Sequence, residues 1–143
     1  MAETAARPRM FKLAVAAELE AFGASGKVES SLDIADQFIH LSDVGAPPTV
    51  AKLFFSGATD LQLLEIDESK LTGPVNWVVG KMGDAPPDAE TVSKSPLTIH
   101  YMLPDGCVHV YGSAGVPMSA VIKQAPVPLG ADGVHVFPEW LTN

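Results

Sequence analysis

The sequence has a single cysteine, Cys107, and no long apolar run. One thiol cannot form an internal disulfide, and no second cysteine is present to help bind zinc. A membrane-spanning helix needs about 20 mostly apolar residues, and no segment supplies them. The first ten residues also lack the apolar stretch of a secretory signal, so we expect a cytoplasmic protein.

Basic residues are few and scattered. Nine Lys and Arg stand against 17 Asp and Glu, which gives a formal net charge of −8. Nucleic-acid binding needs clustered cations that face the phosphates, and only Arg7 and Arg9 are close in sequence. An acidic surface is also repelled by anionic lipids. We therefore expect neither nucleic acid nor membrane as a partner, and the sequence leaves the oligomeric state unknown.

What the chain does contain is enough apolar residues for one domain. It has 143 residues, of which 47% are hydrophobic and 18% are charged, a composition typical of a folded globular unit. A chain of this length buries enough apolar surface to fold without disulfides or a structural metal. We expect residues 1–9 to form a disordered tail and residues 10–143 to form a single domain.

Periodicity and turn residues predict an α+β fold. Helices are predicted at 16–24, where glycines end the helix, and at 49–56, where two prolines precede it. Residues 80–96 carry three prolines and no apolar period, which predicts a surface loop. Short apolar strands are predicted at 11–15, 38–42, 61–66, 75–79, 97–103, 107–111, 119–123 and 134–137. Because strands and helices do not alternate regularly, we expect a curved mixed or antiparallel sheet with two short N-terminal helices.

The tripeptide Pro104-Asp105-Gly106 predicts a hairpin turn between two of these strands. Side chains on a strand alternate between the two faces of a sheet, so the register of the hairpin decides which residues share a face. His100 is predicted to lie on the face opposite His109. The predicted pairs are Leu103 with Cys107, Tyr101 with His109, and Ile99 with Tyr111.

Several segments, in order along the chain, resemble a family called domain of unknown function 952. The strand Phe38-Ile39-His40-Leu41-Ser42 resembles the FIHLS signature of that family. Further similarities lie at 11–13, 16–19, 61–66, Trp77 and 109–112, so the resemblance covers about residues 10–137. It implies an ADP-ribosyltransferase-like fold, whose enzymes split the nicotinamide bond of NAD.

One position departs from the family's pattern. A glutamate commonly follows the tryptophan in that family, whereas Val78 follows Trp77 here. An ADP-ribosyltransferase usually needs a carboxylate beside the nicotinamide ribose to stabilise the developing positive charge, and valine cannot supply it. The resemblance thus implies NAD as a candidate cofactor and NAD-dependent transfer as an alternative function, while Val78 favours a domain without that activity. The sequence leaves open whether the protein is an enzyme.

Two pairs of polar residues are candidates for a binding site. His40 and Ser42 lie two positions apart on one predicted strand, and His109 and Tyr111 do so on another, so each pair points to one face. Imidazole and hydroxyl groups at this spacing can bind a ribose or phosphate, or transfer protons near neutral pH. The alternative is structural, with His40 holding a loop carbonyl and Ser42 capping a turn. The family resemblance favours the functional interpretation for His40, Ser42 and His109.

Lys12 and Trp77 complete the candidate set. Lys12 is flanked by apolar residues, where a lysine either meets an anion or extends along an edge strand to water. Trp77 is either a ligand platform or part of the core. Zinc needs three or four ligands, so no metal is predicted, and nothing in the sequence orients Cys107 as a nucleophile.

These residues lead to one preferred function and one further alternative. We predict a cleft that binds a nucleotide or another small anionic ligand, lined by Lys12, His40, Ser42, Trp77, His109 and Tyr111. The further alternative is a protein-interaction module that uses residues 80–96.

Overall fold

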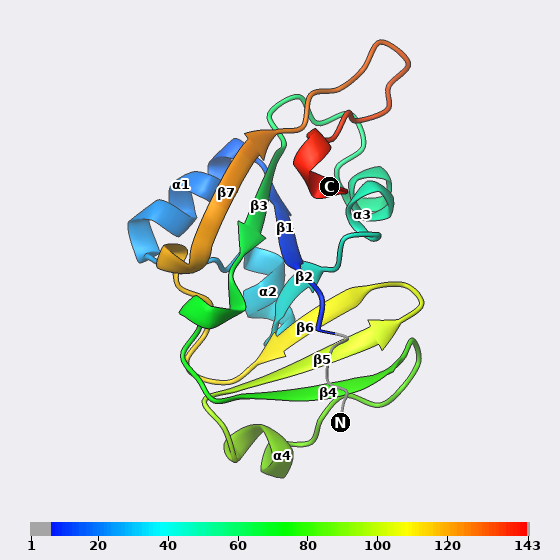
Figure 1. Cartoon of the computed structure of the whole chain (residues 1–143). Helices are drawn as coiled ribbons and strands as arrows, with labels where there is room; N and C mark the ends of the chain where they lie inside the picture. Colours follow the sequence, from blue (N-terminus) through cyan, green and yellow to red (C-terminus); the bar gives the residue numbers. More distant parts are fainter. Residues whose placement is uncertain (1–6, 143) are drawn as a thin grey trace.

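The computed structural model describes residues 7–142. It contains a seven-stranded sheet with strand order β4-β5-β6-β2-β1-β3-β7 (Figure 1). β4 and β5 run parallel, and the other neighbouring strands are antiparallel. The predicted α+β class and mixed sheet are therefore confirmed. The strands are β1 (Met10–Ala14), β2 (Ile39–Ser42), β3 (Gln62–Ile66), β4 (Val75–Lys81), β5 (Leu97–Leu103), β6 (Cys107–Tyr111) and β7 (Val121–Pro126).

The described residues form four α-helices rather than the two that the sequence predicted. These are α1 (Ala16–Ser25), α2 (Ser31–Asp36), α3 (Pro47–Phe54) and α4 (Ala89–Ser93). α1 and α3 correspond to the predicted helices, and α2 and α4 were missed. α2 starts with a capping box in which the Ser30 side chain accepts from the Asp33 amide while Asp33 accepts from the Ser30 amide. This serine and aspartate three residues apart were the available sequence signal for α2.

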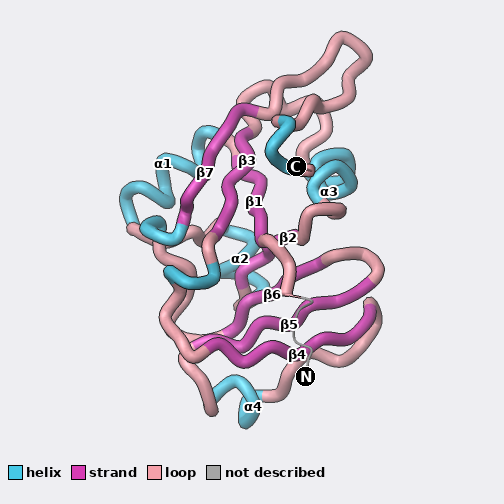
Figure 2. The backbone as a smooth tube through the Cα atoms, in the orientation of Figure 1, coloured by secondary structure: helices cyan, strands magenta, loops and turns pink. Residues whose placement is uncertain are grey.

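The sheet consists of two groups of strands joined at β2. β1, β3 and β7 lie in the upper part of Figure 2 and β4, β5 and β6 in the lower part. β2 shares four paired positions with β6 but only one with β1, between Ser42 and Phe11. The sheet therefore opens between β1 and β2, and this opening positions the candidate site.

Two apolar clusters stabilise these groups. The larger cluster contains Phe22 of α1 together with Ile99 and Val110, and thus packs α1 over one face of the sheet. The smaller contains Phe11 of β1, Ala51 of α3 and Leu141 of the short 3-10 helix Glu139–Leu141. The two clusters lie on opposite faces of β1, since Met10 and Ala14 belong to the larger cluster and Phe11 and Leu13 to the smaller one.

The register of the β5–β6 hairpin differs from the predicted one by one residue. Met102 pairs with Cys107 and His100 with His109, so the prediction that these two histidines lie on opposite faces was wrong. The observed register places Ile99 and Val110 together in the larger core cluster. A shift of one residue would place Ile99 and Val110 on opposite faces of the sheet, so their burial in one cluster decides the register.

Three other segments differ from the predictions. Residues 134–137 form no strand, and His135 makes only an isolated bridge with Leu129. β7 begins at Val121 rather than at residue 119, after a 3-10 helix at Met118–Ala120. Residues 80–96, predicted as a loop, contain the end of β4 and all of α4.

The predicted tail at 1–9 falls partly outside the description, because residues 1–6 are not described. Arg7 and Arg9 are described, and both form ion pairs: Arg7 with Glu68, at 2.9 Å, and Arg9 with Glu65, also at 2.9 Å. Within residues 7–142, none of the helices combines the length and the apolar character that a bilayer crossing requires.

Candidate functional site

His40 lies between two aspartates of α2. Its Nδ1 is 2.7 Å from Oδ1 of Asp33, and its Nε2 is 3.0 Å from Oδ2 of Asp36. Ionised carboxylates only accept hydrogen bonds, so His40 can donate to both only when both ring nitrogens carry protons. The Asp33 side chain is fully buried, whereas that of Asp36 is 42% exposed. His40 thus has one buried partner inside the protein and one partner at the protein surface.

The opening between β1 and β2 explains why Asp33 and Lys12 are buried beside His40. The backbone amide of His40 donates to Asp33 Oδ1 at 3.0 Å, and the His40 carbonyl accepts from Lys12 Nζ at 2.9 Å. Because β1 has diverged from β2 here, these side chains supply the hydrogen bonds that a neighbouring strand would otherwise make. Lys12 and Asp33 also form an ion pair at 3.0 Å. Lys12, predicted as a ligand contact, therefore has its ammonium engaged within the protein.

Four donors surround the Asp33 carboxylate. Besides Lys12 and the two groups of His40, the amide of Ser30 donates to Oδ2 at 2.8 Å. Burial by itself raises the pKa of Asp33, but the hydrogen bond from His40, the charge of Lys12 and the backbone donors together lower it well below its usual value. Asp33 is therefore ionised at neutral pH and fixes the orientation of the His40 ring.

The three histidines His40, His109 and His100 form a row across β2, β6 and β5, which we call the histidine row. His40 pairs with His109, and His109 pairs with His100. The ring centroids of His40 and His109 are 5.3 Å apart. The Phe38 ring is tilted against both imidazoles, with centroid distances of 4.4 Å to His40 and 4.3 Å to His109. The structure therefore brings together the two predicted histidines, in an aromatic environment.

Burial and charge keep His109 neutral. Burial is the largest cause that lowers its pKa, the neighbouring His40 and His100 lower it further, and the result is about 4. At neutral pH a neutral His109, which can accept a proton or a hydrogen bond, therefore lies beside His40, whose two ring nitrogens each face a carboxylate.

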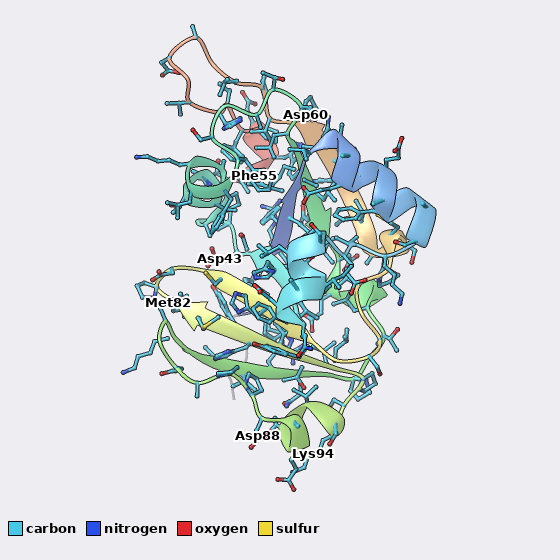
Figure 3. The ribbon with its side chains drawn as sticks, turned by 180° about the vertical axis from the view of Figure 1, so that it is seen from behind. Asp43, Phe55, Asp60, Met82, Asp88 and Lys94 are labelled. Atoms are coloured by element: carbon cyan, nitrogen blue, oxygen red, sulfur yellow. The ribbon has the colours of Figure 1, made fainter. Side chains whose placement is uncertain are left out.

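A groove of about 450 Å³ adjoins this row, within the size range of small-molecule sites. Figure 3 shows α2 in front of the sheet and α4 at its lower end, and the groove lies between these helices and the end of β6. Asp36 and Tyr111 connect it to the row, since Asp36 contacts His40 and the Tyr111 ring lies 5.0 Å from that of Phe38. This α2–α4 groove is lined by Asp36, Gln37, Pro87, Ala89, Val92, Ser93, Ser95, Tyr111, Gly112 and Ser113.

Besides Lys12, two predicted site residues lie apart from this groove. Trp77 pairs with Ile99, packs against the larger core cluster and donates from Nε1 to Glu68 at 3.0 Å. Ser42 shares the face of His40 but is buried at the opposite end of β2, where it pairs with Cys107. His40, His109 and Tyr111 are thus the predicted residues that the structure places beside the groove.

Sequence reasoning missed the two aspartates that hold His40. Asp36 precedes His40 by four residues, and Asp33 is part of the capping box of α2. Recognition of the capping box would have predicted a helix that ends just before the histidine strand, with carboxylates able to reach its first residues. The ion pair with Lys12 depends on the opening of the sheet, for which the sequence contains no local signal.

The structure also bears on two other chemistries, a cysteine nucleophile and a bound metal ion. Burial is the largest cause that raises the pKa of Cys107, and the charges of Asp105 and Asp43 add to it, so the thiol stays protonated at neutral pH. Across the described range, 7–142, no three His, Cys, Asp or Glu side chains are arranged to hold a metal ion, even though three histidines share a row.

Comparison with known proteins agrees with the resemblance seen in the sequence. A family model described as a protein of unknown function, DUF952, matches residues 13–124. The chain belongs to the DUF952 family. A search of the curated proteins finds none that matches this DUF952 member. The ADP-ribosyltransferase-like fold, which the sequence resemblance implied, stays a prediction.

Solved structures similar to this DUF952 chain come from the protein CC0527 of Caulobacter crescentus. The crystal structure of a double mutant of CC0527 is 25% identical, with a TM-score of 0.65, and the match covers 94% of this chain and 99% of that one. The crystal structure of CC0527 itself has the same identity and coverage and a TM-score of 0.63. A solution NMR structure is 27% identical, with a TM-score of 0.51 and coverage of 88% and 90%. The similarity therefore extends over nearly the whole of both chains.

Proposed function

We propose that this DUF952 domain binds a small anionic ligand, with nucleotides as the leading class, and that the anion binds His40 Nε2 in place of Asp36. The observation that carries the proposal is the exposed Asp36 carboxylate, 3.0 Å from a ring that Asp33 orients from the buried side. A carboxylate in this place makes the contact that a ligand phosphate or carboxylate would make. The rest of the ligand would lie in the α2–α4 groove, where Tyr111 offers a ring and a hydroxyl.

Lys12 has an indirect role in this proposal. Its ammonium neutralises Asp33, so the pair adds no net charge beside the His40 ring. The Nε2 atom of His40 can then meet an incoming anion once Asp36 moves away. His109, neutral and one strand further along, can donate or accept one additional hydrogen bond.

Substitution of Asp36 and His40 should change ligand binding in opposite directions. Asp36→Asn removes a competing carboxylate, so we expect ADP-ribose, AMP or inorganic phosphate to bind up to roughly fivefold more tightly, as expected for loss of an exposed ion pair. His40→Gln removes the imidazole donor and should abolish the binding. Thermal-shift measurements with these three probes, followed by titration of the best one, give the comparison.

A control separates this effect from changes in stability. Asp60→Asn replaces an exposed aspartate that accepts from the amide of Ala16, and it should leave the affinity unchanged. If Asp36→Asn weakened binding as His40→Gln does, Asp36 would be a positioning residue, and displacement by the ligand would be ruled out.

NAD-dependent transfer is expected to be absent. Val78 pairs with His100, so an apolar side chain stands beside the histidine row where the family resemblance leads one to expect a carboxylate. We expect no nicotinamide when the protein is incubated with NAD and the mixture is analysed by liquid chromatography. Release of nicotinamide that His40→Gln abolishes would instead establish the enzyme alternative.

A further inference from the structure

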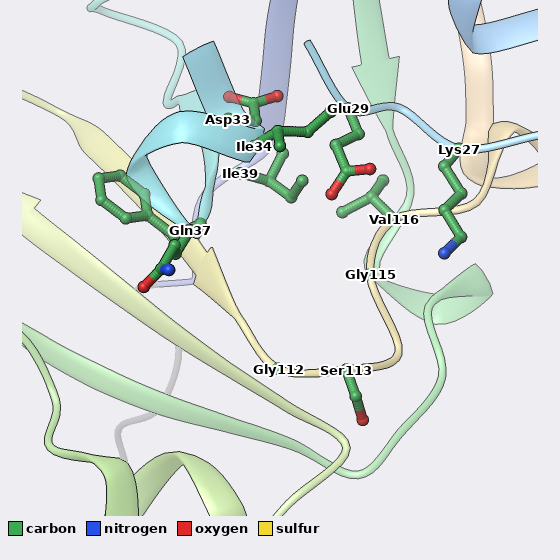
Figure 4. A pocket seen from close by; sticks show the side chains of 11 residues that line it. Lys27, Glu29, Asp33, Ile34, Gln37, Ile39, Gly112, Ser113, Gly115 and Val116 are labelled. Atoms are coloured by element: carbon green, nitrogen blue, oxygen red, sulfur yellow. The ribbon is translucent and has the colours of Figure 1, made fainter. Parts of the chain in front are cut away.

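A second pocket shares Gln37, Gly112 and Ser113 with the α2–α4 groove. Besides the Asp33 carboxylate, which is paired with Lys12, it contains one positive and one negative side chain that do not pair with each other. It has a volume of about 260 Å³ and lies between α2, residues 27–29 and the 112–116 loop (Figure 4). Lys27 and Glu29 both line it, and within residues 7–142 neither takes part in an ion pair. We infer that this pocket binds a small zwitterion of the α-amino acid type, independently of His40.

The backbone explains why Lys27 and Glu29 share this pocket. They lie two residues apart, and Val28 between them is completely buried in the larger core cluster. In an extended segment, alternate side chains point to opposite sides, so burial of Val28 directs its two neighbours outward. Figure 4 shows the Glu29 side chain extending toward the loop that carries Gly115 and Val116.

The walls of the pocket are held by backbone hydrogen bonds. Val28 N donates to Val116 O at 2.8 Å, and Met118 N donates to Gly26 O at 2.9 Å. Lys27 and Pro117 form the bridge between these two segments. The two charged side chains therefore project from a fixed frame rather than from a loop that binding would have to order, which lowers the entropic cost of binding.

The chemistry of the pocket selects the class of ligand. An ammonium of the ligand would meet the Glu29 carboxylate, and a carboxylate of the ligand would meet the Lys27 ammonium, as charge-assisted hydrogen bonds. Ile39 and Val116 are buried and line the same pocket, and Ile34 lies at its rim with 62% of its surface exposed. These groups favour an aliphatic side chain. The volume lies below the usual range for drug-sized ligands and suits a free amino acid.

The test uses L-valine and two molecules that each lack one of its charges, isovalerate and isobutylamine. Backbone amide resonances in a ¹H–¹⁵N correlation spectrum report the site of binding. We expect valine to shift resonances of residues 27–39 and 112–116 with an affinity of about millimolar. We expect isovalerate and isobutylamine to bind roughly tenfold or more weakly, since each lacks one charge-assisted contact.

Matched variants decide between a zwitterion site and a simple ion site. Lys27→Met and Glu29→Gln should each weaken valine binding roughly tenfold or more, whereas Lys52→Met on α3 and Glu20→Gln on α1 should have no effect. His40→Gln should also leave valine binding unchanged, which separates this inference from the proposed function. Valine binding that Glu29→Gln leaves intact, equal binding of isovalerate, or the absence of shifts with valine would each overturn the inference.

Discussion

Replacing Asp33 with alanine is expected to lower the free energy of unfolding by about 3–5 kcal/mol, the cost of breaking a buried ion pair by removal of one partner. The side chain of Lys12 is 6% exposed, so the substitution would leave a buried ammonium without its counter-ion. It would also remove the acceptor of both the His40 amide and the His40 ring. A loss of this size is a large part of the roughly 5–15 kcal/mol that stabilises a typical domain.

Urea unfolding followed by circular dichroism measures this loss, and two variants serve as controls. Asp36→Ala removes the exposed partner of His40 and should cost within about 1 kcal/mol. The double variant Lys12→Met with Asp33→Leu removes both buried charges, so it should be more stable than Asp33→Ala alone. If Asp33→Ala were as mild as Asp36→Ala, the buried ion pair between Lys12 and Asp33 would not be a main source of stability.

Stability should fall as the pH decreases from 6.5 to about 4, and His109 should cause much of the loss. Above pH 6.5 the ring is neutral in both the folded and the unfolded chain and contributes nothing. Below pH 6.5 this histidine becomes protonated in the unfolded chain, whereas in the folded protein it stays neutral down to about pH 4. Protonation therefore favours unfolding. This difference in pKa corresponds to at most about 3 kcal/mol once the pH reaches 4, and solvent around the partly exposed ring reduces it.

Comparison of wild type with His109→Gln tests whether His109 causes this loss of stability. Glutamine has no proton to take up in this range, so the variant should lose less free energy of unfolding between pH 6.5 and pH 5 than the wild type does. Asp33 also makes the protein less stable as the pH falls, because its lowered pKa means that its stabilisation disappears when the carboxylate is protonated. This loss occurs at lower pH than that of His109. An unchanged pH dependence in His109→Gln would show that His109 is not a buried neutral ring.

Local sequence patterns predicted the strands around the site better than they predicted how those strands pair. The strand that carries His40 and the hairpin that carries His109 both follow from short apolar runs between turn residues, and the structure places their rings 5.3 Å apart. The face of His100 could not be derived from the turn. It depends on burial of Ile99 with Val110, which is a property of the packed core.

The roles of Lys12 and Asp33 show a second limit of prediction from the sequence. An apolar strand with one lysine indicates that the lysine meets an anion or reaches water, but the sequence does not identify the anion. Asp33 becomes that anion because β1 and β2 share one paired position and then diverge, which leaves backbone groups of His40 to be satisfied by side chains. Divergence of two strands is a consequence of the whole sheet, so neither strand's sequence encodes it alone.

The most direct test of the proposed anion site is the state of the His40 ring with and without ligand. A long-range ¹H–¹⁵N spectrum near neutral pH should show both ring nitrogens of His40 protonated in the free protein. Addition of ADP-ribose should then shift the Nε2 resonance of His40 and leave that of His135, which contacts the carbonyl of Ala58, in place. A His40 ring with one proton, or an Nε2 resonance that stays fixed at saturating ADP-ribose, would contradict the account.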